Sequence, residues 1–129
     1  MKKLFFYLFA AITLTFTACD KDDDCEGDSL ETTIIGNWKV FIAGLAEVGE
    51  IEFKANGDFT NDENLLIPEE IGGQPVTTKT YSVQSNSMFT LHASNSEGSS
   101  DFPLTVTSFE CDEIKTNFQG LVEYTFRRQ

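Results

Sequence analysis

From residue 34 onward, apolar residues recur at every second position in short runs that turn residues separate. This spacing places one apolar face on a β-strand, whereas an amphipathic helix needs a period near 3.6 residues. The pattern predicts about eight short strands and no amphipathic helix after residue 18. The residues expected on the inward faces include Gly36, Trp38, Val40, Ile42, Ile51, Phe53, Tyr81, Val83, Phe89, Leu91, Leu104, Val106, Ile114, Phe118, Tyr124 and Phe126.

Tight turns join the predicted strands. Asn56-Gly57 and Gln119-Gly120 accept the positive φ that a two-residue hairpin needs, residues 84–87 form another turn, and residues 95–100 are expected to be a polar loop. Strands that are joined this way pair antiparallel, and a closed barrel leaves no free edges. We therefore expect an all-β, up-and-down antiparallel barrel of about eight strands over residues 33–129. A two-sheet β-sandwich is the alternative.

Residues 62–78 interrupt the alternation. They contain two prolines and the Gly72-Gly73 pair, which argue against a central strand or a helix. We expect a long loop whose apolar tip is Leu65-Leu66-Ile67. Such a tip is either a lid over an apolar ligand or a plug that folds back into the domain, because exposed apolar residues in a loop lower solubility.

The N-terminus has the pattern of a secretory signal. Lys2 and Lys3 precede an apolar run from Leu4 to Phe16, which ends at Ala18-Cys19. This ending resembles a bacterial lipobox, in which the signal (here residues 1–18) is removed and the cysteine (here Cys19) receives diacylglycerol. The run is too short to span a bilayer comfortably as an uncleaved anchor. Residues 19–32 are then an acidic tether, and the membrane is a partner through the lipid anchor.

The acidic run at residues 20–24 indicates a location. It resembles the export signal with which Bacteroidetes-type bacteria send lipoproteins to the cell surface. The alternative is a solvated spacer, which a charge run usually is, on a periplasm-facing protein. We expect an outer-membrane lipoprotein that is exposed at the cell surface.

Charge and cysteine content narrow the partners and the compartment. The net charge of the chain is −12, which argues against nucleic acid as a partner because phosphates are repelled. Of the three cysteines, Cys19 is assigned to lipidation, and Cys25 and Cys111 remain. In an oxidising compartment these two are expected to form a disulfide, and two free thiols are the alternative.

Residues with catalytic or metal-binding potential are few. His92 is the only histidine, and it alternates with Leu91, so we expect it on the outer face with Met88 and Thr90. No partners for it are evident, so no Ser-His-Asp or Cys-His set is predicted. Residues 58–63 contain carboxylates, but their spacing does not match an EF-hand loop. We expect no catalytic residue, no metal site, no cofactor and no enzymatic activity.

Three segments resemble small lipocalin-like lipoproteins of Bacteroidetes. Residues 35–38 contain the Gly-x-Trp of a first strand, residues 53–59 resemble the second hairpin, and residues 124–128 resemble the last strand. The resemblance implies that Trp38 lies at the closed end of the barrel with a late arginine over its ring. Arg128 is preferred to Arg127 because it shares a face with Tyr124 and Phe126. Gly36, Trp38 and Arg128 are therefore expected to form a structural floor.

A barrel of this kind suggests two functions. The first is binding of a small apolar ligand in a preformed cup. The residues expected to line it are Val40, Ile42, Phe53, Leu65, Leu66, Ile67, Tyr81, Phe89, Leu91 and Tyr124. The chain is short for a lipocalin, so its own side chains can fill the barrel. The alternative is thus a non-enzymatic structural or interaction lipoprotein that docks a partner envelope lipoprotein.

Overall fold

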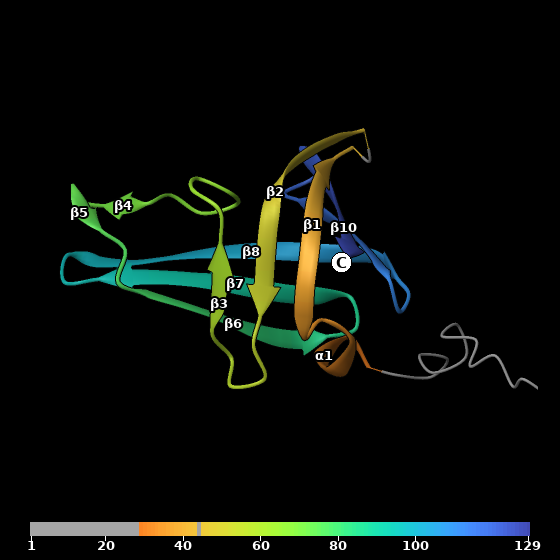
Figure 1. The fold of residues 1–129 in the computed structure, drawn as a ribbon. Helices are drawn as coiled ribbons and strands as arrows, with labels where there is room; N and C mark the ends of the chain where they lie inside the picture. Colours follow the sequence, from red (N-terminus) through yellow and green to blue (C-terminus); the bar gives the residue numbers. More distant parts are fainter. Residues whose placement is uncertain (1–28, 44) are drawn as a thin grey trace, which may run out of the picture.

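The computed structural model describes residues 29–43 and 45–129. The expected signal peptide, the lipidated Cys19, the acidic run and Cys25 lie outside the described residues. An eight-stranded antiparallel sheet nearly closes into a barrel (Figure 1). This confirms the all-β barrel that the alternation of apolar residues predicts.

Strands that neighbour each other in the main sheet also follow each other along the chain, except at one point, where the first strand pairs with the last. The elements are α1 (Leu30–Thr33), β1 (Gly36–Ile42), β2 (Ala46–Phe53), β3 (Phe59–Asn61), β4 (Glu70–Ile71), β5 (Gln74–Pro75), β6 (Thr78–Ser85), β7 (Met88–Asn95), β8 (Gly98–Phe109), β9 (Glu113–Phe118) and β10 (Val122–Arg128). The sheet order is β3-β2-β1-β10-β9-β8-β7-β6. Trp38 pairs with Arg128 at one end of the β1–β10 pair, and Ile42 pairs with Tyr124 at the other. We call these ends the floor and the mouth.

The seam of the barrel lies between the edge strands β3 and β6. A single bridge joins Asp58 to Thr80 there. Tyr81 contributes twice, because its backbone N–H donates to the carbonyl of Gly57 at 2.8 Å and its hydroxyl donates to the carbonyl of Lys54 at 2.7 Å. Burial raises the pKa of the Tyr81 phenol above its ordinary value, which keeps it protonated as a donor. A few hydrogen bonds therefore close the seam in place of a full strand ladder.

Aromatic side chains fill the interior. Phe53 lies among four other rings, with centroid distances of 4.9 Å to Tyr81, 5.9 Å to Phe89, 6.1 Å to Phe59 and 6.3 Å to Phe126. Tilted and edge-on pairs at these separations stabilise a core beyond the area they bury. The centre of the barrel is consequently packed with its own side chains.

A one-turn helix closes the floor. Residues 30–32 were expected to belong to the tether, but the structure forms α1 at Leu30–Thr33, and Leu30 and Ile34 are completely buried. The indole Nε1 of Trp38 donates to the carbonyl of Ile34 at 2.7 Å. The turn is too short to show a helical period in the sequence. The packed domain therefore begins at residue 30.

Arg128 seals the floor over Trp38. Its guanidinium lies 4.3 Å from the centroid of the indole ring, so the expected cation–π pair is present. It donates hydrogen bonds to the backbone carbonyls of Thr33 at 2.6 Å, Ile35 at 3.0 Å and Cys111 at 2.8 Å. Burial lowers the pKa of the Arg128 guanidinium from its ordinary value, while the nearby Asp112 opposes that shift. These contacts tie the last strand to α1, to the start of β1 and to the β8–β9 turn.

Residues 62–78 are more ordered than a plain loop. They contain the small hairpin of β4 and β5, which turns at Gly72 and Gly73 with φ of 62° and 78°. The side-chain amide of Asn95 donates to the carbonyls of Ile71 at 2.9 Å and Gln74 at 2.7 Å. The hairpin is thereby fixed to the tip of the β7–β8 hairpin, as Figure 1 shows.

The prediction of a polar loop at residues 95–100 is wrong. Asn95 pairs with Gly98, so the turn consists of Ser96 and Glu97 alone, and β8 begins at Gly98. The Asn95 side-chain oxygen accepts hydrogen bonds from the backbone N–H groups of Glu97 and Gly98. This Asx-type turn lets a polar sequence continue as strand on an outward face.

Substitution of Gly36 tests the floor. Gly36 has φ of +131°, and a Cβ there would lie 2.6 Å from Nη1 of Arg128. We expect Gly36→Ala to lower the free energy of unfolding by about 3 kcal/mol, because backbone strain adds to displacement of the guanidinium. Gly73→Ala is the control, since Gly73 has φ of +78° and no atom within 4 Å of the added Cβ. It should lose about 1 kcal/mol in urea unfolding. Equal losses would show that Arg128 is not involved.

Candidate functional site

An apolar cavity lies near the mouth. Its volume is about 100 Å³, and six residues line it, namely Leu66, Leu91, Phe102, Leu104, Phe118 and Tyr124. They come from the middle of β7 and β8, from the mouth ends of β9 and β10, and from the loop after β3. We call this space the mouth cavity.

The volume of the mouth cavity limits what it can hold. Pockets for drug-sized ligands measure about 300–1,000 Å³, and an engineered apolar cavity of about 150 Å³ binds benzene. At about 100 Å³, the mouth cavity holds only a group of a few carbon atoms unless a lining residue moves. A larger hollow of about 340 Å³ lies at the seam, but polar residues such as Lys54, Asp58 and Lys79 line much of it.

The three residues of the apolar loop tip differ in position, and each of the two expected roles, plug and lid, fits some of them. Leu65 and Ile67 are 5% and 3% exposed and pack into the core, as a plug would. Leu66 between them is half-buried and lines the mouth cavity, as a lid would. The side-chain amide of Asn61 donates to the Leu65 carbonyl at 2.6 Å, and Lys79 Nζ donates to the Asn61 oxygen at 2.7 Å. Buried neighbours and a hydrogen-bonded backbone therefore hold Leu66.

Leu66 has a strained backbone. Its φ is +66°, in the left-handed region that costs a residue with a Cβ about 1–2 kcal/mol. Such strain persists where the surroundings enforce it, and it is concentrated at ligand clamps and switch regions. Leu66 is thus a lining residue of the mouth cavity with a strained backbone.

The predicted lining residues are only partly brought together at the cavity. Leu66, Leu91 and Tyr124 line it. Six others do not: Val40, Phe53, Leu65, Ile67 and Phe89 are buried in the core, and Tyr81 is half-buried at the seam. Ile42 is 41% exposed at the end of β1 and does not line the cavity. It lies at the mouth end of the strand, where no opposing layer covers it.

Three lining residues were not among the predicted ligand-binding residues. Leu104 and Phe118 follow the inward alternation of their strands, so the signal for them was present in the sequence. Leu104 was the first residue expected on this strand, but β8 begins six residues earlier, at Gly98. Phe102 was therefore not expected to lie on a strand.

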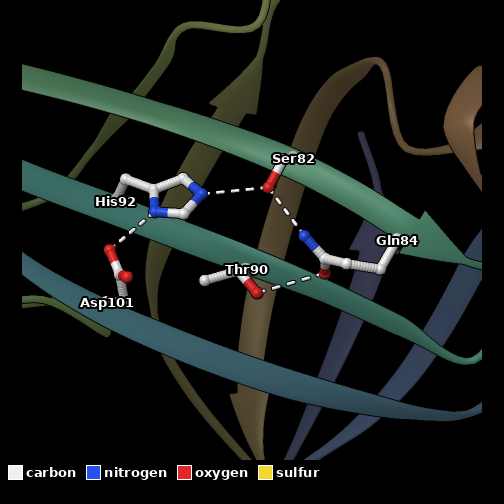
Figure 2. Close-up of polar contacts among 5 residues, drawn as sticks. All are labelled: Ser82, Gln84, Thr90, His92 and Asp101. Atoms are coloured by element: carbon white, nitrogen blue, oxygen red, sulfur yellow. Dashed lines mark hydrogen bonds and ion pairs between the residues drawn. The ribbon is translucent and has the colours of Figure 1, made fainter.

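A hydrogen-bonded chain of polar side chains lies across β6, β7 and β8, on the face opposite the core (Figure 2). Ser82 Oγ lies 2.9 Å from His92 Nε2, and His92 Nδ1 lies 2.6 Å from Asp101 Oδ1. Gln84 Nε2 donates to Ser82 Oγ at 2.7 Å, and Thr90 Oγ1 donates to Gln84 Oε1 at 3.1 Å. We call these five residues the outer-face cluster.

The proton positions in the outer-face cluster follow from its donors and acceptors. In the arrangement with an ionised Asp101 and a neutral imidazole, Nδ1–H of His92 donates to Asp101, and Nε2 accepts from the Ser82 hydroxyl. The lone pairs of Ser82 Oγ then accept the Gln84 amide hydrogen. This order of nucleophile, base and orienting carboxylate is the one that acyl-transfer enzymes use.

The outward position expected for His92 is confirmed, since its side chain is 37% exposed. The expectation that it has no partners is wrong. Asp101 faces it directly across the β7–β8 pair, and Ser82 lies two residues along β6 from Thr80, the residue that pairs with His92. Residues 95–100 were expected to form a polar loop that ends directly before Asp101. Asp101 was therefore not placed on a strand opposite His92. A two-residue turn at Ser96-Glu97 would have revealed the register.

No family model, curated protein or solved structure matches this chain. Within residues 29–43 and 45–129, no helix is long and apolar enough to cross a membrane. In the same segments, no three His, Cys, Asp or Glu side chains are grouped so that they would hold a metal ion.

Two substitutions in the loop test which residue acts as a plug in the core and which acts as a lid over the cavity. We expect Leu65→Ala to lower the free energy of unfolding by about 2–3 kcal/mol, because it empties a buried position. Leu66→Gly should change it by no more than about 1 kcal/mol, because relief of the left-handed strain offsets the lost apolar contact. Urea unfolding measures both. If Leu66→Gly destabilised as much as Leu65→Ala, Leu66 would be part of the plug.

Proposed function

We propose that this protein is a lipid-anchored envelope protein with a lipocalin-like barrel that binds a small apolar group at its mouth. The observation that carries the proposal is the mouth cavity, whose walls are five apolar side chains and one tyrosine. An apolar pocket with few polar groups is the usual form of a small-molecule site. The floor is sealed by Trp38 and Arg128, so a ligand would enter at the mouth alone.

The size of the cavity defines the ligand class. A space of about 100 Å³ accommodates a short alkyl group, and an aromatic ring requires Leu66 to move. A longer apolar molecule would insert only its end and leave the remainder outside the barrel. The proposed ligand is therefore a short hydrocarbon group or the end of a longer apolar molecule.

The orientation of the barrel supports an anchored binding protein. The described chain begins beside α1 at the floor, so a tether from a lipidated Cys19 would reach the domain at the end opposite the mouth. The lipobox-like sequence and acidic run support an outer-membrane location with the domain exposed at the cell surface. The mouth would then face away from the membrane.

A disulfide between Cys25 and Cys111 is part of the proposal. The carbonyl of Cys111 accepts a hydrogen bond from Arg128, whose guanidinium also donates to the carbonyl of Thr33, the last residue of α1. Cys111 thus lies at the floor, where the tether enters. A bridge there would link the tether to the β8–β9 turn and restrict the unfolded chain.

Ligand binding can be followed at the methyl groups of the cavity. On titrating residues 20–129 with benzene, we expect shifts of the Leu66, Leu91 and Leu104 methyl signals in a methyl-selective NMR spectrum. Leu66→Ala should tighten binding severalfold, because it enlarges the cavity and widens its entrance. Leu121→Ala is the control, since Leu121 is 80% exposed at the same end and does not line the cavity. Unchanged methyl signals in both the wild type and Leu66→Ala would refute the proposal.

A second candidate function is docking of a partner envelope protein. It is favoured by apolar side chains exposed at the mouth, where Leu45 and Leu121 are 89% and 80% exposed and Ile42 and Val48 lie nearby on the β1–β2 hairpin. The two hairpins meet there, because the Ala43 N–H donates to the carbonyl of Glu123. Exposed apolar clusters of this kind are typical of interaction sites.

Paired serine substitutions test the docking function. We expect Leu45→Ser with Leu121→Ser to weaken crosslinking to a partner on intact cells, with no loss of folding stability because both side chains are exposed. Met88→Ser is the control, at an exposed apolar residue in a different part of the sheet. Identical crosslinking patterns for all three proteins would exclude this surface.

A further inference from the structure

We propose that the outer-face cluster is an acyl-transfer site, in which Ser82 is the nucleophile and His92 the general base toward exposed carboxylic esters. The proposal is independent of the mouth cavity, because none of the five residues lines it. It rests on the distances within the cluster and on the strands that hold it.

The sheet positions the three central residues. His92 pairs with Asp101 across β7 and β8, and with Thr80 across β6 and β7, which places Ser82 at the next outward position of β6. β7 is bonded to a strand on both sides, so its backbone is held on each edge. Sites built on strands keep their geometry better than sites on loops. The distances of 2.9 Å and 2.6 Å are within the range required of a nucleophile, a base and an orienting group.

The acylation step follows from the proton positions. Ser82 Oγ attacks the ester carbonyl carbon while its proton moves to Nε2 of His92. The bond to the alcohol oxygen breaks, and that oxygen takes the proton from Nε2, which leaves the acyl group on Ser82. Asp101 accepts the Nδ1 hydrogen throughout, so it holds the tautomer and stabilises the imidazolium that forms.

Deacylation returns the site to its starting state. A water attacks the acyl carbon and passes one proton to Nε2 of His92. The bond to Ser82 Oγ then breaks, Ser82 recovers that proton from Nε2, and a carboxylic acid is released. The two steps together consume one ester and one water and yield one alcohol and one acid.

Gln84 supplies the donor that a tetrahedral intermediate needs. Its amide nitrogen lies 2.7 Å from Ser82 Oγ and carries a second hydrogen, which is available to the developing oxyanion. Thr90 donates to Gln84 Oε1 and fixes which end of the amide faces Ser82. Figure 2 shows Gln84 on the side of Ser82 away from Asp101. Gln84 and Thr90 therefore complete the arrangement of nucleophile, base and oxyanion donor.

The exposure of the cluster defines its substrates. The side chains of His92 and Asp101 are 37% and 66% exposed, and neither the mouth cavity nor the hollow at the seam includes a member of the cluster. Such a site selects neither the acyl chain nor the alcohol. It should act on esters with good leaving groups that reach an open sheet surface, and at modest rates because solvent screens its charges.

The full-length lipoprotein in detergent micelles, incubated with p-nitrophenyl acetate, tests the proposal. We expect release of p-nitrophenol with a burst, and one acetyl group on the peptide that contains Ser82 by mass spectrometry. Ser82→Ala should lower the rate above background by about 100-fold, within the range that a positioned base supplies. Ser99→Ala is the matched control, because Ser99 is an exposed strand serine outside the cluster, and it should leave the rate unchanged.

Two further variants distinguish a catalytic role of the cluster residues from a merely structural one. His92→Ala should abolish the burst, and added imidazole should restore it, which a merely structural histidine would not allow. Asp101→Asn should lower kcat by about tenfold or more and leave KM unchanged, because the wrong tautomer is held. Acetylation that appears only on lysines, or a rate that Ser82→Ala does not change, would overturn the proposal even if the mouth cavity binds its ligand.

Discussion

The Arg128 guanidinium joins parts of the chain that are far apart in sequence. It stacks on Trp38 and binds carbonyls at residues 33, 35 and 111, so one side chain connects α1, β1, the β8–β9 turn and the last strand. Hydrogen bonds from a charged donor each contribute about 1.5–3 kcal/mol. The close approach needs Gly36, where any Cβ would strike the guanidinium. Closure of the barrel at the floor depends on this set of contacts.

With the floor sealed and Phe53 at the centre of an aromatic core, little interior space is left. The remaining apolar volume lies at the mouth, beside a leucine held in a left-handed conformation. Because so little of the interior is open, the barrel offers its surfaces, more than its interior, to a ligand or partner. One surface is the mouth with its small cavity and exposed hairpin tips, and another is the outer face of β6, β7 and β8.

Much of the fold was predictable from residue patterns. The inward positions of Trp38, Phe89 and Phe126 follow from period-two alternation, and the turn at Gln119-Gly120, with φ of 53° and 71°, follows from its residue types. The outer-face cluster was not predictable in the same way. Its residues are polar and outward, so hydrophobic periodicity says nothing about them, and a one-residue error in a hairpin turn changes every cross-strand neighbour.

The sequence by itself determined most of the strands and their inward faces, because burial of apolar side chains imposes a periodicity that can be read locally. Only the tertiary structure decided how much of the barrel its own side chains fill, since a cavity is the difference between an enclosed volume and the volumes of residues from distant strands. It also decided that Ser82 and Asp101 flank His92, because strand register depends on where each turn begins and ends.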